Sequence, residues 1–278
     1  MNTHSEIITP DDPTRRKLRK PERGELSKNT QTYAFLGTQF QPLTADQTLQ
    51  RASWITAAHS FRYIVTPNVD HIVRLSREPD VFKPLYRAAW LSVCDSRILE
   101  LLARFAGIPL HAVPGSDLTR GIIEDIADTD TPVTVIAGNE AVAKTVAGKY
   151  GLTNMSVHVP PMGLRHKPDA VAACADFIAS HAARYHFICV GSPQQEMIAK
   201  AALERGDCTG LGLCVGASLD FLAGVQSRAP KGMQNARLEW LYRLYKEPTR
   251  MWRRYLVDGP SVFIIYFKWI IKSALQRH

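Results

Sequence analysis

The sequence predicts an α/β protein with a Rossmann-like, mostly parallel sheet, helices on both faces of the sheet, and a C-terminal helical appendage. Short apolar segments alternate with amphipathic segments of about 10 to 15 residues, which is the pattern of repeated βαβ units. Glycines follow several of the apolar segments and directly precede the next amphipathic one, as strand-to-helix turns require. The basic residues near the C-terminus are interleaved with aromatic ones, which indicates helices with a charged face.

Apolar runs and capping residues define the expected elements of the first half of the chain. Strands are predicted at residues 33–36, 63–65 and 90–94. Helices are predicted at residues 44–59, 68–77, 96–105 and 117–127.

The second half shows a clearer alternation of the two kinds of segment. Strands are predicted at residues 133–136, 155–159, 187–190 and 211–215. One helix is predicted to follow Gly138-Asn139 and to end at Tyr150, and further helices are predicted at residues 169–181, 194–204 and 218–222. Right-handed crossovers bring the carboxyl ends of parallel strands to one edge of the sheet. We therefore expect Gly138, Gly191 and Gly216 at that edge, where a ligand would bind.

The charge distribution divides the chain into three parts. Residues 1–30 are polar and proline-containing, and we expect a disordered basic tail there. Residues 31–228 form the predicted α/β core, with an N-terminal part (31–130) and a nucleotide-binding part (131–228). Residues 229–278 form the predicted basic amphipathic appendage, and the net charge of the whole chain is +8.

A basic segment that carries aromatic residues has several explanations. Arg228–His278 contains 11 Lys and Arg against 3 acidic residues, with five Trp and Tyr residues between Trp240 and Tyr255. Anionic lipid head groups, nucleic acid and a bound phosphate would each attract such a surface. A solvated helix surface without a partner would also explain it.

Cysteine usage and hydropathy indicate a cytoplasmic protein at a membrane surface. The five cysteines form no CxxC pair, which favours reduced thiols. We expect no secretory signal, since no apolar stretch precedes Tyr33. The apolar run 261–271 is interrupted by Lys268 and is shorter than the roughly 20 residues that cross a bilayer. It is expected to lie in the interface.

We call the strand-to-helix turns at Gly138, Gly191 and Gly216, and the equivalent turns after the other strands, corners. Glycine corners suit a nucleotide because backbone N–H groups can approach a phosphate there, next to the positive end of a helix dipole. Tight turns alone would also account for each glycine. The sequence contains no GxGxxG turn, which disfavours a dinucleotide.

Several motifs occur in a specific order between residues 33 and 255. They are Thr66-Pro67-Asn68, Asp95, Gly115-Ser116-Asp117-Leu118, Gly191-Ser192-Pro193-Gln194-Gln195-Glu196, Val215-Gly216-Ala217, Asp220-Phe221-Leu222-Ala223-Gly224, Arg228-Ala229-Pro230 and Leu238-Glu239-Trp240-Leu241-Tyr242-Arg243-Leu244, with Glu247-Pro248 and Arg250. In order and spacing the chain resembles the WecG/TagA/CpsF glycosyltransferase family.

The resemblance implies an inverting glycosyltransferase. It would move a sugar from a UDP-sugar to a polyprenyl-diphosphate-linked saccharide in bacterial cell-surface polysaccharide synthesis, exopolysaccharide among them. It implies no catalytic metal and no cofactor other than the UDP-sugar as co-substrate. It also implies a peripheral location on the inner face of the cell membrane, with contact made through the appendage. The sequence leaves homo-oligomer formation open.

Asp95 is the predicted catalytic residue. It follows a predicted strand, and the resemblance places the family's catalytic aspartate here. An inverting transfer needs a carboxylate to take the proton of the acceptor hydroxyl. Two alternatives stay open: Asp95 caps the helix that begins near Ser96, or Asp117 is the base. The family usually has glycine where this chain has Ser96.

The predicted substrate-binding residues lie at other strand ends. By resemblance, Thr66 and Asn68 contact the substrate, although Asn68 also suits a helix cap. In Gly115-Ser116-Asp117, Ser116 or Asp117 is expected to cap a helix, which is compatible with ligand binding. Gln194 and Gln195 open a helix after a glycine corner, where amides can read a uracil edge or sugar hydroxyls.

Arginines of the appendage are predicted to bind the diphosphate. Arg243, Arg250 and Arg253 have the guanidinium forks that suit phosphate, and the resemblance assigns such residues to the leaving diphosphate. Alternatively, Arg243 pairs with Glu239 and Glu247 at i,i+4 spacing. The DxD sequence Asp128-Thr129-Asp130 precedes a strand, at the wrong edge for catalysis, so we expect no metal there.

Two other classes of protein remain as alternatives. A Rossmann-type oxidoreductase would use similar corners, but it should contain a GxGxxG turn, which this sequence lacks. A nucleic-acid-binding module would explain the basic appendage and should lose affinity steeply with salt.

Overall fold

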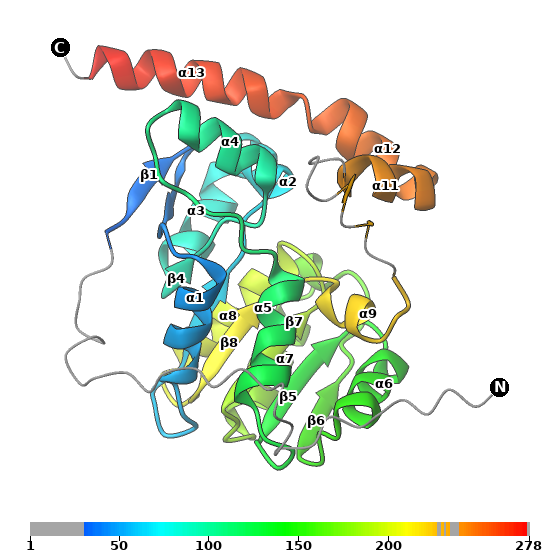
Figure 1. Ribbon diagram of the computed structural model, residues 1–278. Helices are drawn as coiled ribbons and strands as arrows, with labels where there is room; N and C mark the ends of the chain where they lie inside the picture. The colour runs from blue at the N-terminus through cyan, green and yellow to red at the C-terminus, as the bar shows by residue number, and fades with distance from the viewer. Residues whose placement is uncertain (1–30, 227–228, 231, 234–238, 277–278) are drawn as a thin grey trace.

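The computed structural model describes residues 31–226, 229–230, 232–233 and 239–276, and a six-stranded, all-parallel sheet forms its centre (Figure 1). The strand order is β4-β3-β8-β7-β5-β6. The strands are β3 (Arg62–Val65), β4 (Leu91–Ser92), β5 (Val133–Ala137), β6 (Met155–His158), β7 (Tyr185–Cys189) and β8 (Leu211–Cys214). The predicted fold class, an α/β parallel sheet with a C-terminal helical region, is confirmed.

Helices cover both faces of the sheet because successive strand side chains point to opposite sides. In β3, Tyr63 and Val65 join one buried cluster and Ile64 joins the other. The first face carries α2 (Val69–Arg77), α3 (Pro79–Arg87), α4 (Arg97–Phe105), α7 (Pro168–Ala179) and α8 (Gln194–Arg205). The second carries α1 (Ala45–Ser53), α5 (Gly115–Gly121), α6 (Glu140–Tyr150) and α9 (Ser218–Leu222).

The strand order brings distant parts of the sequence together. β3 pairs in parallel with β8, from Arg62 opposite Leu211 to Val65 opposite Cys214. β7 lies on the other side of β8 and next to β5. The loops that follow β3, β8, β7 and β5 therefore lie side by side at the carboxyl edge of the sheet.

Four elements differ from the sequence prediction. The helix predicted at 44–59 ends at Ser53, as α1. The strand predicted at 33–36 is a hairpin of β1 (Tyr33–Phe35) and β2 (Thr38–Phe40), outside the main sheet. The short helix α3 was not predicted; it begins at Pro79, and proline is tolerated in a first helical turn. The helix predicted at 117–127 begins earlier, as α5, and continues as the π-helical turn η1 (Ile122–Ile126).

The C-terminal region packs on the core through its last helix. It consists of α11 (Glu239–Lys246), α12 (Pro248–Trp252), η3 (Arg253–Asp258) and α13 (Ser261–Leu275). Figure 1 shows α13 running along the top of the molecule, with α11 and α12 above α9. Val262 and Tyr266 are buried in the first-face cluster, and the Trp269 ring lies 5.2 Å from that of Phe35. Arg77 of α2 forms an ion pair of 2.7 Å with Asp258.

None of the helices in the described residues is long and apolar enough to cross a membrane. The tail predicted to be disordered, residues 1–30, lies outside the described residues.

Candidate active site

The corners that follow β3 and β8 are in direct contact at the carboxyl edge. Thr66 is buried, and its hydroxyl donates a hydrogen bond of 3.1 Å to the carbonyl of Cys214. A Cβ atom added to Gly115 would lie 3.3 Å from Thr66 Oγ1 and 3.4 Å from the Cα of Val215. The absence of a side chain at Gly115 thus lets the start of α5 approach both corners closely.

Asp95 lies next to the same corners. Its backbone N–H donates to the carbonyl of Pro67 at 2.9 Å. The residue before it, Cys94, forms an isolated parallel bridge with Ala112, and Val113 donates to the Cys94 carbonyl at 2.7 Å. The segment that leads to Gly115 therefore runs beside Asp95.

Ser96, and not Asp95, caps the helix that follows β4. Ser96 is the N-cap of α4, and its side-chain oxygen accepts a hydrogen bond of 3.2 Å from the N–H of Leu99. The alternative in which Asp95 is the cap is therefore wrong. Asp95 is partly exposed at the end of a strand, and its role as a general base stays a prediction.

Asn68 does have the capping role that we considered. Its side-chain oxygen accepts from the N–H groups of Asp70 and His71, and His71 Nδ1 accepts from the Asn68 N–H at 2.9 Å. At the start of α5, by contrast, Pro114 is the N-cap and no side chain caps the helix. The capping prediction for Ser116 and Asp117 is wrong, and both residues lie in the first turn of α5.

The corner that follows β7 is joined to that of β8 through a buried amide. Gln195 is only 2% exposed, and its side-chain oxygen accepts a hydrogen bond of 2.8 Å from the N–H of Gly216. The backbone N–H of Gln195 donates to the carbonyl of Gly191 at 2.9 Å. Gly138 lies beside this corner, because Ala137 and Cys189 are paired at the ends of β5 and β7.

This arrangement corrects one expectation. We expected the N–H of Gly216 to face a phosphate, but it is directed to Gln195 inside the protein. Gln194, one residue earlier, is half-buried in the first turn of α8. Direct contact of Gln194 or Gln195 with a ligand stays a prediction.

Glu196 is a buried carboxyl group next to this amide. It is 1% exposed, and its Oε1 accepts from Gln195 Nε2 at 2.7 Å. Burial raises the pKa of Glu196, and the hydrogen bond from Gln195 together with the nearby Ser192 hydroxyl lowers it to a smaller extent. The sequence motif does not reveal the burial of this acid, because burial depends on the packing of α8 against the sheet.

The arginines predicted to bind the diphosphate lie in the appendage. The backbones of Arg243, Arg250 and Arg253 belong to α11, α12 and η3. Their side chains lie outside the described part of the structure. η3 packs against α2, the helix that Asn68 caps.

Among the described residues, no group of three or more His, Cys, Asp or Glu side chains could hold a metal ion. The DxD sequence Asp128-Thr129-Asp130 precedes β5, opposite the carboxyl edge, as predicted. There the Thr129 carbonyl accepts from the N–H of Thr153 at 2.8 Å.

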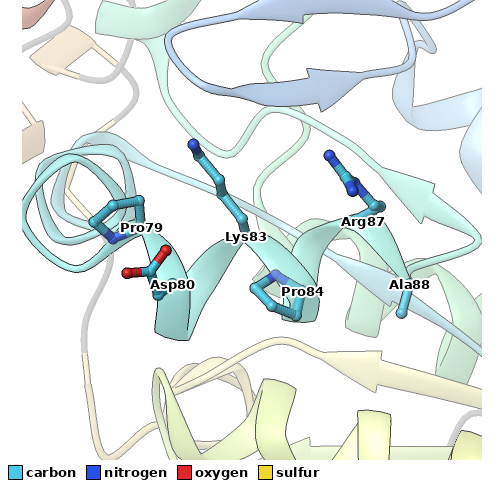
Figure 2. A pocket seen from close by; sticks show the side chains of 6 residues that line it. All are labelled: Pro79, Asp80, Lys83, Pro84, Arg87 and Ala88. Carbon is cyan, nitrogen blue, oxygen red and sulfur yellow. The ribbon is translucent and has the colours of Figure 1, made fainter.

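A surface groove with a volume of about 540 Å³ lies along α3, away from these corners (Figure 2). Figure 2 shows Lys83 and Arg87 projecting from the same side of the helix. None of the predicted site residues lines the groove, which is formed by Pro79, Asp80, Lys83, Pro84, Arg87 and Ala88.

The fold is that of an α/β protein with a parallel sheet, a class in which ligands commonly bind at the carboxyl ends of the strands. The family model described as "Glycosyl transferase WecG/TagA/CpsF family" matches residues 33–276. The chain belongs to this family and is a glycosyltransferase of cell-surface polysaccharide synthesis. Membership indicates a sugar-nucleotide donor and a lipid-linked acceptor.

The assignment of the α4 cap predicts a stability effect. Ser96→Ala should lower the free energy of unfolding by about 1 kcal/mol, because the N–H of Leu99 loses its partner. Chemical denaturation of the two proteins measures the difference. Ser96→Asn is the matched control, since asparagine also caps helices and should restore most of the loss. An unchanged free energy in Ser96→Ala would show that the cap is not at this residue.

The raised pKa of Glu196 predicts a pH-dependent stability. The folded protein holds this proton more tightly than the unfolded chain, whose carboxyl has the ordinary pKa of 4.5. The stability of the wild type relative to Glu196→Gln is therefore highest below pH 4.5 and falls as the pH rises through the folded pKa, by up to ~1.4 kcal/mol per pH unit. Urea unfolding of both proteins at several pH values measures it. A difference that does not vary with pH contradicts the prediction.

Proposed function

We propose that the protein is an inverting glycosyltransferase that moves a sugar from a UDP-sugar to a polyprenyl-diphosphate-linked saccharide. The observation that carries the proposal is the position of Asp95. It follows β4, does not cap the next helix, and lies beside the corners of Thr66–Asn68 and Gly115. A carboxylate at the edge where the substrate would bind is what a general base requires.

In the proposed reaction, Asp95 takes the proton of the acceptor hydroxyl while the oxygen attacks the anomeric carbon. The bond from that carbon to the UDP oxygen breaks, and UDP departs with the bonding electrons. Attack from the side opposite to UDP inverts the anomeric configuration. The proton ends on the Asp95 carboxyl group.

The rest of the carboxyl edge would hold the donor. Thr66 and Asn68 flank Pro67, which accepts from the Asp95 N–H, and Gly115 lies against Thr66 at the start of the helical turn that holds Ser116 and Asp117. Gly138, Gly191, Gln194, Gln195 and Gly216 belong to the neighbouring corners. Arg243, Arg250 and Arg253 would stabilise the negative charge of the leaving diphosphate. With arginines in this role, the proposed reaction needs no metal ion and no cofactor.

The appendage offers a surface for the membrane that contains the acceptor. One side of α13 is packed on the core, while large apolar side chains on the other sides are exposed. These residues are Phe263, Ile264, Phe267, Ile271 and Leu275. Lys268 and Lys272 are exposed beside them. Apolar residues with adjacent lysines are typical of a helix that lies in the interface of an anionic membrane. We propose that the protein binds the inner face of the cell membrane in this way.

Replacing the proposed base tests the reaction. Asp95→Asn keeps the size of the side chain but cannot accept the proton, so the transfer rate should fall by about 10²- to 10⁴-fold. The affinity for UDP should stay within about threefold, because the mechanism gives Asp95 no role in nucleotide binding. Transfer is measured with a UDP-sugar panel and a short-chain prenyl-diphosphate saccharide, and UDP binding by calorimetry.

Two aspartates serve as comparisons in the same assay. Asp130→Asn alters the DxD sequence at the opposite edge and should retain full activity. Asp117→Asn tests the alternative base in the first turn of α5. Full activity in Asp95→Asn together with its loss in Asp117→Asn would transfer the catalytic role to Asp117.

The exposed face of α13 gives a separate prediction. The triple variant Ile264→Ser, Phe267→Ser and Ile271→Ser should lower binding to anionic lipid vesicles at least about tenfold, because apolar burial in the interface is lost. Co-sedimentation with vesicles measures it. The fold should be retained, since each of the three side chains is at least 60% exposed. Binding equal to the wild type would show that another surface meets the membrane.

A further inference from the structure

Glu196 is a buried acid to which the proposed reaction gives no task. Its Oε1 accepts from Gln195, whereas its Oε2 has no hydrogen-bond partner in the described residues. The Ser192 hydroxyl and the Tyr86 phenol nearby are also buried without a partner in that part of the chain. An acid in such a place destabilises the fold unless a compensating interaction exists.

The hydrogen bond between Glu196 and Gln195 decides how the Gln195 amide is oriented. The amide lies between an acceptor, Glu196 Oε1 at 2.7 Å, and a donor, the N–H of Gly216 at 2.8 Å. Exchanging its oxygen and nitrogen would set two acceptors against each other on one side and two donors on the other. The acid therefore selects the orientation in which the amide oxygen faces Gly216.

The corner at Gly216 is close to the proposed reaction site. Gly216 has a φ of +56°, a left-handed conformation that glycine adopts easily. The preceding residue, Val215, and Thr66 both lie against Gly115, since a Cβ atom added to Gly115 would be 3.4 Å from the Cα of Val215 and 3.3 Å from Thr66 Oγ1. A displacement of the Gly216 corner would therefore also displace the segments of Thr66 and Gly115, which lie next to Asp95.

The β7 corner is also held from α2. Arg74 donates from Nη1 to the carbonyl of Ser192 at 2.8 Å and forms an ion pair of 2.9 Å with Asp70. The backbone from which Gln195 projects is thus fixed on one side. What remains to be set is the orientation of the amide.

From this geometry we infer that Glu196 is a positioning residue. It orients the Gln195 amide and through it holds the Gly216 corner of β8 in the shape that the transfer reaction needs. The inference rests on the proposed function, because it assigns the corner to the donor site. Glu196 itself touches neither substrate in this account.

Amide hydrogen exchange and kinetics of Glu196 variants test the inference. Glu196→Leu keeps an apolar side chain of similar size but offers no acceptor. The Gly216 N–H should then exchange about tenfold faster, since its partner is no longer held. Amides in the middle of β5 and β7 should keep their exchange rates. The same variant should lower kcat/KM about 10- to 100-fold through displacement of the corner.

Conservative and matched variants separate positioning from a general loss of structure. Glu196→Gln retains an acceptor oxygen and should recover most of the Gly216 protection and of the activity. Glu204→Gln, an exposed acid on the same helix, should leave the exchange rate of Gly216 unchanged. If Glu196→Leu does not fold, Glu196→Met makes the same test, because its more adaptable side chain of similar length also lacks an oxygen acceptor and leaves Gln195 in place.

The outcomes distinguish the inference from the proposed function. Unchanged Gly216 exchange in the folded variants overturns the inference, and so does faster exchange with wild-type kcat/KM. If the wild type transfers no sugar from any donor, the proposed function fails. The exchange rates then still decide whether Glu196 holds the corner.

Discussion

The parallel pairing of β3 with β8 is the interaction on which the candidate site depends. It places the end of the first strand of the sheet beside the end of the last one, so that Thr66 bonds to Cys214, 148 residues further along the chain. Gly115 then fits between the two corners. Without this pairing, Asp95 and the corner at Gly216 would belong to separate parts of the sheet. The site is therefore a consequence of topology as much as of its individual residues.

Local patterns were sufficient for most of the fold. Runs such as Val133–Ala137 are apolar, short and followed by glycine or a capping residue, so their type and position could be predicted. The order of the strands could not, because nothing in the segment around Thr66 specifies β8 as its neighbour. The helix α3 was missed because Pro84, inside it, disfavours a helix locally, whereas burial of Phe82 and Leu85 stabilises it in the folded protein.

The sequence was sufficient to predict which residues lie at the candidate site, but not what each of them does there. Asp95 and Ser96 are both good helix caps in isolation, and only the hydrogen bond from Leu99 identifies Ser96 as the one used. Gln195 and Gly216 were expected to face the ligand because polar and small residues at strand ends often do. In the structure they bond to each other, which depends on the adjacency of β7 and β8. Such roles arise from contacts between corners that the sequence leaves far apart.

The central claim is that a sugar nucleotide binds across these corners at the carboxyl edge. Mapping the backbone amide NMR shifts during a titration with UDP tests it most directly. We predict the largest shifts at residues 66–68, 95–96, 115–117, 138, 191 and 194–196, with little change at the amino edge around Asp130. Shifts concentrated at the amino edge or along the α3 groove, with none near Asp95, would contradict the account.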